Sequence, residues 1–293
     1  MRIAFVGKGG SGKTTITAAF SSFLEKNIDL PVIIFDADIN MNLSSVLGYE
    51  KPSFEKHLSN PKNIKIIKEF LLGKREIKDI NVFIKTTPPS KNSNIIKIEN
   101  IDKTPLKDFY YSKNNIKIFT IGTYQDYEIG ASCYHNNLAI FEIILNHLDD
   151  KNGIVVADMV AGVDAFASTL HAQFDILCFV VEPSLKSLEV LDTYIKLIKS
   201  ADEWESFFIL GNKIINREDE EFLKNNINED KIIGFFKYDD YIHLLEREGG
   251  GMNFEKLNDS NKKTIDLIFK KLKSLPDRRN LRLKKIWELH KKY

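Results

Sequence analysis

Glycines, lysines and hydroxyl groups near the start of the chain have the spacing of a phosphate-binding loop. The pattern G-x-x-x-x-G-K-[ST] fits Gly7 through Thr14, directly after the apolar run Ile3–Val6. Glycines let successive N–H groups turn toward phosphate oxygens, and a following helix adds the positive end of its dipole. Lys13 is expected to reach the β- and γ-phosphates, and the Thr14 hydroxyl to bind Mg²⁺. The predicted phosphate-binding residues are Gly7, Lys8, Gly9, Gly10, Ser11, Gly12, Lys13, Thr14 and Thr15.

Carboxylates follow two further apolar runs. Asp36 and Asp38 come after Ile33–Phe35, and Asp158 comes after Ile154–Ala157. An Asp at the carboxyl end of a strand can hold Mg²⁺ directly or through water. Asp36 and Asp158 are therefore predicted Mg²⁺ ligands. Asp36 would equally suit a structural, hydrogen-bonded role, and the whole segment also reads as an acidic strand-to-loop turn.

Alternating apolar runs and helix-like stretches predict the elements that position these residues. Ile3–Val6 and Pro31–Phe35 read as buried strands with the helix-like Thr15–Lys26 between them, which is a βαβ unit. We therefore expect an α/β fold with a doubly wound, mostly parallel sheet flanked by helices, in which ligands bind at the carboxyl ends of the strands. Further strands are expected at 116–121, 153–157, 176–181 and 207–210, and helices at 137–148, 185–199 and 218–226.

The chain is expected to form a single nucleotide-binding domain, residues 1–275, followed by a basic tail, residues 276–293. An insertion at about 53–115 breaks the strand–helix rhythm with Thr87-Pro88-Pro89-Ser90 and a polar run. The tail holds seven Lys or Arg against two Asp or Glu. It reads as a solvated terminal helix, and alternatively as a basic amphipathic helix lying on an anionic membrane.

Composition narrows the class of protein. The 293 residues are 43% hydrophobic and 28% charged with a formal net charge of +1, which is ordinary for a globular protein and gives no global basic field for DNA. Cys133 and Cys178 lie far apart, which suits a reducing compartment rather than a disulfide scaffold. Without an apolar run of membrane-spanning length, the chain is expected to be cytoplasmic.

Lys8 adds a second lysine to the phosphate-binding loop, and the string Lys8-Gly9-Gly10-Ser11-Gly12-Lys13-Thr14-Thr15 resembles the deviant Walker A motif. The family with this motif includes the nitrogenase iron protein, division-site and chromosome-partition ATPases, and nickel-insertion ATPases. The resemblance implies ATP with Mg²⁺, a homodimer, and a catalytic Lys8 that reaches the partner's nucleotide. It would neutralise charge in the transition state as an arginine finger does.

Two later segments extend the resemblance. Residues 35–43, with Ile39 where proline is usual, are similar to the family's switch I, which implies that Asp38 positions or activates the attacking water. Residues 158–162 are similar to switch II. Asn212 matches the position that reads the adenine edge, for which an amide offers a donor and an acceptor. Residues 234–239 resemble a loop around the base, with Lys237 replacing proline.

The strings 155–164 and 180–189 look most like the ATPase that inserts nickel into carbon monoxide dehydrogenase. That branch implies a client metalloenzyme and a Cys-x-Cys metal site at the dimer interface. Here Cys133-Tyr134-His135 stands at about that place, so Cys133 and His135 are candidate ligands for Ni²⁺ or Zn²⁺, with a polar interface loop as the alternative. The iron–sulfur branch is disfavoured because its second cysteine would fall where this chain has Ala161.

Overall fold

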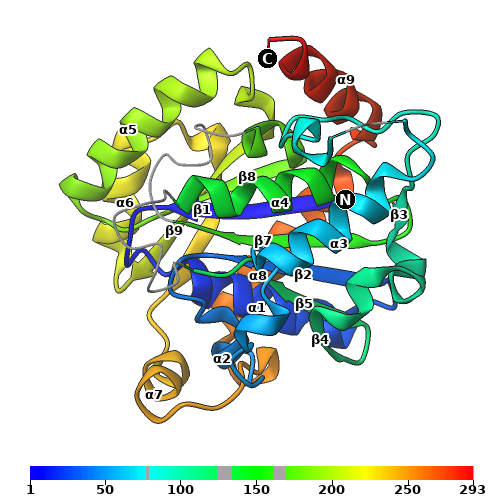
Figure 1. The fold of residues 1–293 in the computed structure, drawn as a ribbon. Coiled ribbons are helices and arrows are strands. Elements are labelled where there is room, and N and C mark those ends of the chain that lie inside the picture. The colour runs from blue at the N-terminus through cyan, green and yellow to red at the C-terminus, as the bar shows by residue number, and fades with distance from the viewer. Residues whose placement is uncertain (77–78, 124–133, 161–168, 293) are drawn as a thin grey trace.

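The structure, a computed structural model, describes residues 1–76, 79–123, 134–160 and 169–292. Within these residues an eight-stranded sheet runs through the molecule in the order β10-β9-β8-β1-β7-β2-β5-β4 (Figure 1). Its strands pair in parallel, and β4 joins β5 antiparallel at one edge. They are β1 (Arg2–Gly7), β2 (Val32–Ala37), β4 (Tyr110–Lys113), β5 (Ile116–Thr120), β7 (Ile154–Met159), β8 (Ile176–Val181), β9 (Phe207–Ile214) and β10 (Ile232–Lys237). A short second sheet pairs β3 (Ile96–Lys97) with β6 (Leu148–Asp149).

Helices cover both faces of the large sheet, which confirms the predicted doubly wound α/β fold. Apolar side chains of α1 and α8 pack on one face, and those of α4, α5 and α6 on the other. The central strands are buried along their whole length, as near-continuous apolar runs require. The helices are α1 (Lys13–Asn27), α2 (Leu43–Val46), α3 (Pro61–Leu72), α4 (Tyr134–Asn146), α5 (Leu185–Ser200), α6 (Arg217–Asn226), α7 (Asp240–Glu248), α8 (Asp259–Ser274) and α9 (Arg279–His290).

Local capping signals set where several helices begin. The Ser184 hydroxyl accepts a hydrogen bond from the Ser187 N–H at the start of α5. Asn216 and Asp219 form a reciprocal capping box at the start of α6. By contrast, α1 begins after Gly12 without a side-chain cap, so its first N–H groups are left for another partner.

The expectation of a loop over residues 234–239 holds only in part, because residues 232–237 form the edge strand β10. Phe236 and Lys237 at the end of this strand, with Tyr238 and Asp239 after it, line the cavity that also contains Asn212, the predicted adenine contact. We expected a loop because of the motif resemblance and gave too little weight to the β-branched and aromatic run Ile232-Ile233-Gly234-Phe235-Phe236, which favours a strand.

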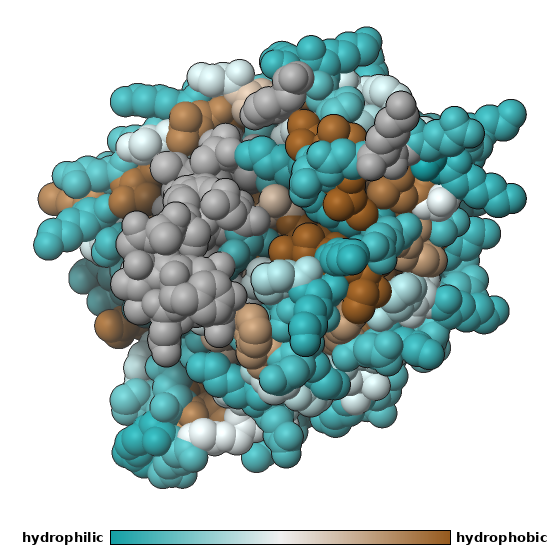
Figure 2. Space-filling view, viewed as in Figure 1, coloured by the Kyte–Doolittle hydropathy of each residue, from teal (hydrophilic) through white to brown (hydrophobic). Residues whose placement is uncertain are grey.

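The insertion packs onto the same core as the sheet rather than forming a core of its own. Its buried side chains Ile67, Leu71 and Phe83 join the cluster that includes α4. The insertion also leaves Ile66 and Val82 exposed. In Figure 2 apolar side chains gather among hydrophilic ones over the region of α3 and the insertion.

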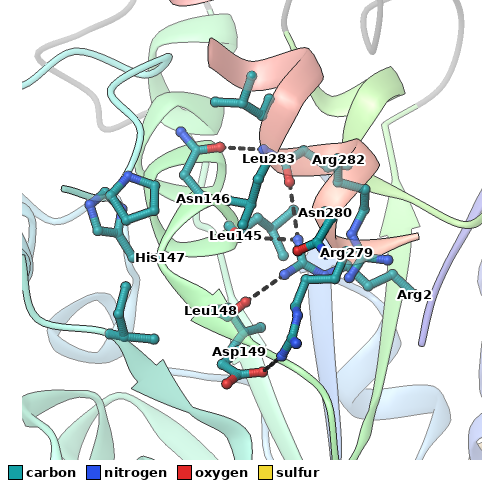
Figure 3. Close-up of a pocket in the computed structure, with 14 residues that line it drawn as sticks. Arg2, Leu145, Asn146, His147, Leu148, Asp149, Arg279, Asn280, Arg282 and Leu283 are labelled. Atoms are coloured by element: carbon teal, nitrogen blue, oxygen red, sulfur yellow. Dashed lines mark hydrogen bonds and ion pairs between the residues drawn. The ribbon is translucent and has the colours of Figure 1, made fainter. Parts of the chain in front are cut away.

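The basic tail folds as α9 and docks at the amino ends of the central strands. Arg282, 5% exposed, pairs with Asp150 at 2.8 Å and with Asp175. Asp150 also binds Arg2 of β1 at 2.9 Å, so two buried guanidinium groups share one carboxylate. The docked helix closes one side of a cavity of about 310 Å³, shown in Figure 3. Among the described residues, no helix is long and apolar enough to cross a membrane.

This ion network predicts a strong stability effect at Asp150. Burial raises the pKa of this carboxyl, but Arg2 and Arg282 outweigh burial and hold the pKa well below its usual range. The carboxylate therefore stabilises the fold above about pH 4 and loses this effect as the pH falls. We expect Asp150→Asn to lower the free energy of unfolding by about 3–5 kcal/mol at pH 7 in urea denaturation, because two buried cations lose their counter-charge.

Asp149→Asn is the matched control. Its partner Arg279 is 28% exposed and Asp149 32%, so water screens this pair and we expect a loss below about 1 kcal/mol. Equal losses for the two variants would contradict the assignment of Asp150 as the centre of a buried network.

Candidate functional site

The loop between β1 and α1 curls closely against neighbouring backbone. A Cβ on Gly7 would lie 2.6 Å from the Val180 carbonyl oxygen, so only glycine fits there. Gly10 and Gly12 have φ of 79° and 92°, the left-handed region that glycine adopts at little cost. The loop ends at the uncapped start of α1. Its glycines and free helix N–H groups together form a cradle suited to an anion.

Lys13 and Thr14 meet Asp158 at the first turn of α1. The Thr14 hydroxyl donates to Asp158 at 2.6 Å, and Thr17 donates to the other carboxylate oxygen at 3.4 Å. Lys13 is 5% exposed, and its Nζ donates to the Lys8 carbonyl at 3.3 Å. Burial lowers the pKa of Lys13, while Asp158 and Asp38 oppose this shift. The arrangement leaves a buried cation and a hydroxyl beside a buried carboxylate at the mouth of the loop.

Asp36 and Asp158 are direct neighbours across the paired strands β2 and β7. Burial raises the pKa of Asp158 to about 7, against the hydroxyl of Thr14 and the charge of Lys13, which lower it. Burial and the nearby Asp158 raise the pKa of Asp36 well above its usual range. Two carboxyl groups so close together disfavour ionisation of both unless a cation joins them.

Both oxygens of Asp36 already have backbone partners. One accepts the Asp38 N–H at 3.4 Å and the other the Leu43 N–H at 3.1 Å. Of the two roles expected for Asp36, the hydrogen bonds match the structural one, in which it holds the loop that carries Asp38. Asp38 is nearly buried, and its Oδ1 accepts from the backbone and side-chain nitrogens of Asn40 at 2.9 Å each.

Asn212 at the end of β9 lies against the phosphate-binding loop. Its Nδ2 donates to the Ser11 carbonyl at 2.7 Å, which leaves Oδ1 as an acceptor. Asn212 lines a cavity of about 150 Å³ together with Gly12, Thr15 and Tyr238. The sequence did not single out two further contacts, from Lys213 Nζ to the Gly10 carbonyl at 2.8 Å and from Thr15 to Glu246 at 3.3 Å. The contact of Lys213 could have been suspected from the sequence, because Lys213 directly follows the predicted site residue Asn212.

The structure thus brings Lys8, Lys13, Asp36, Asp38 and Asp158 to one edge of the sheet. The structure does not place the two expected ligands of Ni²⁺ or Zn²⁺. Cys133 lies outside the described residues, and the side chain of His135, at the start of α4, is not described. In the described part of the chain, no group of three or more His, Cys, Asp or Glu residues is arranged to hold a metal ion.

The oxygen ligands at this edge do fit Mg²⁺. This ion keeps several waters and usually takes one or two protein ligands together with substrate phosphates. Thr14 and Asp158 supply hard oxygen atoms beside the anion cradle, which matches that requirement.

Comparison with known proteins identifies the class. Residues 3–250 match the CobQ/CobB/MinD/ParA nucleotide binding domain, and the chain belongs to this family of P-loop ATPases. It is 30% identical over 273 residues to an uncharacterized ATP-binding protein of Methanocaldococcus jannaschii, covering 92% of this chain and 96% of that protein. It is 24% identical over 250 residues to the carbon monoxide dehydrogenase accessory protein CooC of Rhodospirillum rubrum, covering 85% and 88%.

Solved structures share the fold. The cell division ATPase MinD of Pyrococcus furiosus superposes with a TM-score of 0.60 at 19% identity, covering 94% of this chain and 99% of that one. A ParA family ATPase of Chlorobium tepidum gives 0.56 at 18% identity, covering 90% and 96%. At these identities the likeness supports the architecture alone.

The buried pair of acids predicts a stabilising substitution. Asp158→Asn replaces a buried carboxyl group, which is costly to ionise, with a neutral amide. The amide oxygen can still accept the hydrogen bond from the Thr14 hydroxyl. We expect the unfolding temperature of the nucleotide-free protein at pH 8 to rise by about 2–4 °C, which corresponds to about 1 kcal/mol. Differential scanning calorimetry measures it, with Asp150→Asn as the buried, ion-paired comparison that moves the other way. A lower unfolding temperature for Asp158→Asn would contradict this account of the pair.

Proposed function

We propose that this protein is an ATP-binding and ATP-hydrolysing switch that acts as a cytoplasmic homodimer and helps insert nickel into a client metalloenzyme. The observation that supports the ATPase part most directly is the Thr14–Asp158 hydrogen bond beside buried Lys13, at the uncapped start of α1. Residues 1–275, with the insertion at about 53–115, would form the ATPase unit, and residues 276–293 a docked accessory helix.

In this proposal the chain supplies positioning and charge. Residues 7–15 bind the phosphates through backbone N–H groups, and Lys13 neutralises the β- and γ-phosphates. Thr14 and Asp158 would hold Mg²⁺, which would supply positive charge against the charge that develops on the phosphates. Asp36 keeps the 38–43 loop in place so that Asp38 orients the attacking water, and Asn212 contacts the adenine. Lys8 acts on the nucleotide of the partner subunit.

Two lysine substitutions separate binding from hydrolysis. Lys13→Ala should weaken ATP binding by about thirtyfold or more, because loss of a buried charge partner costs about 2–5 kcal/mol. Lys8→Ala should keep binding within about tenfold while hydrolysis falls by about 10³, the scale of a lost transition-state cation. Isothermal titration and phosphate release measure the two, with the exposed insertion residue Lys91→Ala as the control.

Mixing the two variants tests whether Lys8 acts across subunits. A mixed dimer would pair the intact Lys13 of the Lys8→Ala subunit with the intact Lys8 of the Lys13→Ala subunit. Recovered hydrolysis in the mixture supports action in trans. Full hydrolysis by Lys8→Ala alone refutes the dimer mechanism.

The nickel part is supported by the similarity to the carbon monoxide dehydrogenase accessory protein and by the string Cys133-Tyr134-His135 in the sequence. A thiolate and an imidazole from each of two subunits would make an S₂N₂ set that suits Ni²⁺ or Zn²⁺. The client would then be a metalloenzyme such as carbon monoxide dehydrogenase.

Metal binding by the ATP-bound dimer tests this part. About one Ni²⁺ or Zn²⁺ per dimer is expected by equilibrium dialysis, and Cys133→Ala should abolish it. Cys178→Ala is the matched control, because Cys178 is buried in β8 and burial raises the pKa of its thiol far from neutrality. Unchanged metal binding by Cys133→Ala would reject the nickel role and leave the ATPase proposal intact.

A positioning ATPase on a membrane or on DNA is the alternative. The helix α9 buries Arg282 and Ile286 against the body of the protein, so these two side chains do not face a membrane surface. Trp287 of the same helix remains 45% exposed. ATP-dependent sedimentation with anionic vesicles, lost on removal of residues 276–293, would favour that alternative. ATP-dependent DNA retardation would favour a partition role.

A further inference from the structure

Two consecutive residues at the end of β9 hold the phosphate-binding loop from outside. Asn212 Nδ2 donates to the Ser11 carbonyl at 2.7 Å, and Lys213 Nζ donates to the Gly10 carbonyl at 2.8 Å. Consecutive side chains of a regular strand point to opposite faces. Both reach the same loop here, so the strand must depart from regular geometry at this place.

A β-bulge supplies that departure. In the pairing of β9 with β10, Gly211 stands opposite Phe235 and Ile214 opposite Lys237, so Asn212 and Lys213 share the single partner position between them. Lys213 has φ of 59°, a left-handed conformation that is costly for a residue with a side chain. Bulges often re-aim a side chain next to a functional site. Here the bulge accompanies the turn of Lys213 toward the loop.

The ammonium of Lys213 is anchored on its other side. Glu182, directly after β8, forms an ion pair with Lys213. The side chain of Glu182 is 19% exposed, whereas that of Lys213 is 55% exposed. The carboxylate therefore fixes the position of a side chain that would otherwise be free in water. The pair connects β8 and β9 with Gly9 and Gly10, which form the crest of the loop.

The crest itself has few other restraints. Gly9 and Gly10 are exposed, and a Cβ on Gly10 would meet nothing within 4 Å. A loop whose N–H groups face a bound anion turns carbonyls outward, where either water or a protein side chain can donate to them, and only a protein donor restrains the loop. Without such donors the glycines would sample other conformations, and binding would have to order them.

We propose that Lys213, held by Glu182, is a positioning residue that preorganises the phosphate-binding loop by fixing the Gly10 carbonyl. This inference deepens the proposed function and rests on its nucleotide site, with a polyphosphate as the group that the braced loop receives. Lys213 acts through the loop backbone and makes no contact with the reacting atoms.

Binding of ADP, of a non-hydrolysable ATP analogue and of tripolyphosphate, each with Mg²⁺, tests the brace by isothermal titration. Lys213→Met should raise all three dissociation constants by about fivefold, the scale of one net hydrogen bond. Lys213→Arg, which retains a donor and a charge, should recover at least half of the loss. The maximal hydrolysis rate at saturating ATP should fall less than twofold, so that the effect appears in KM rather than kcat.

The chain offers a matched control in Lys113, which is 59% exposed and pairs with Glu25 at 3.2 Å, away from the loop. Lys113→Met should leave all three dissociation constants unchanged. Glu182→Gln should weaken binding about twofold in the wild type and not at all in the Lys213→Met background, since both act through one contact.

Three results would overturn the proposal. The first is a Lys213→Met protein that binds ADP and tripolyphosphate within twofold of wild type. The second is weaker binding of ADP with unchanged tripolyphosphate, which would make Lys213 a contact to the base or ribose. The third is a fall in the nucleotide-free unfolding temperature of Lys213→Met beyond that of Lys113→Met, which would make its role structural. A wild type that binds ADP without hydrolysing ATP would defeat the proposed function and leave this test valid.

Discussion

The central constraint in this molecule is the burial of Asp36 and Asp158 side by side at the carboxyl ends of β2 and β7. Two like charges close together each raise the free-energy cost of ionising the other, and burial of both groups adds to that cost. Lys13 and the hydroxyls of Thr14 and Thr17 offset only part of that cost, since the pKa of Asp158 still rises to about 7. A site of this kind gains from a bound cation. The features around it, from the glycine loop to the uncapped start of α1, suit an anion that would accompany the cation.

Buried charges are compensated to different extents at the two ends of the parallel strands. At the amino ends of the strands, Asp150 and Asp175 are paired with Arg2 and Arg282, so the buried charges are compensated within the chain. At the carboxyl ends, compensation is incomplete. The first arrangement fixes α9 to the body and contributes stability, whereas the second lowers stability in the absence of a ligand. Such a contrast is expected where a functional site is held by a rigid scaffold.

The architecture followed from the sequence because apolar runs alternate with amphipathic stretches, and because Gly7 to Thr14 places a specific loop between a strand and a helix. Three features did not follow. The edge strand β10 was not predicted, because a motif resemblance favoured a loop there, although Ile232 to Phe236 have high strand propensity. The docking of α9 depends on Arg282 meeting Asp150 and Asp175, which lie more than 100 positions away in sequence. The role of Asp36 depends on which backbone N–H groups lie nearby, and residue type alone left it open.

The loop lysines show how the site is held without a ligand. Lys13 donates to the Lys8 carbonyl inside the loop. From outside, Asn212 donates to the Ser11 carbonyl and Lys213 to the Gly10 carbonyl. The outer contacts are made by groups that a phosphate would not need to displace. The inner contact, at 3.3 Å, is the longest of the three, and Lys13 is the residue expected to turn to the phosphate. An incoming phosphate would therefore let Lys13 exchange a long hydrogen bond to a neutral carbonyl for an ion pair while the loop backbone stays in place, which keeps the ordering cost of binding low.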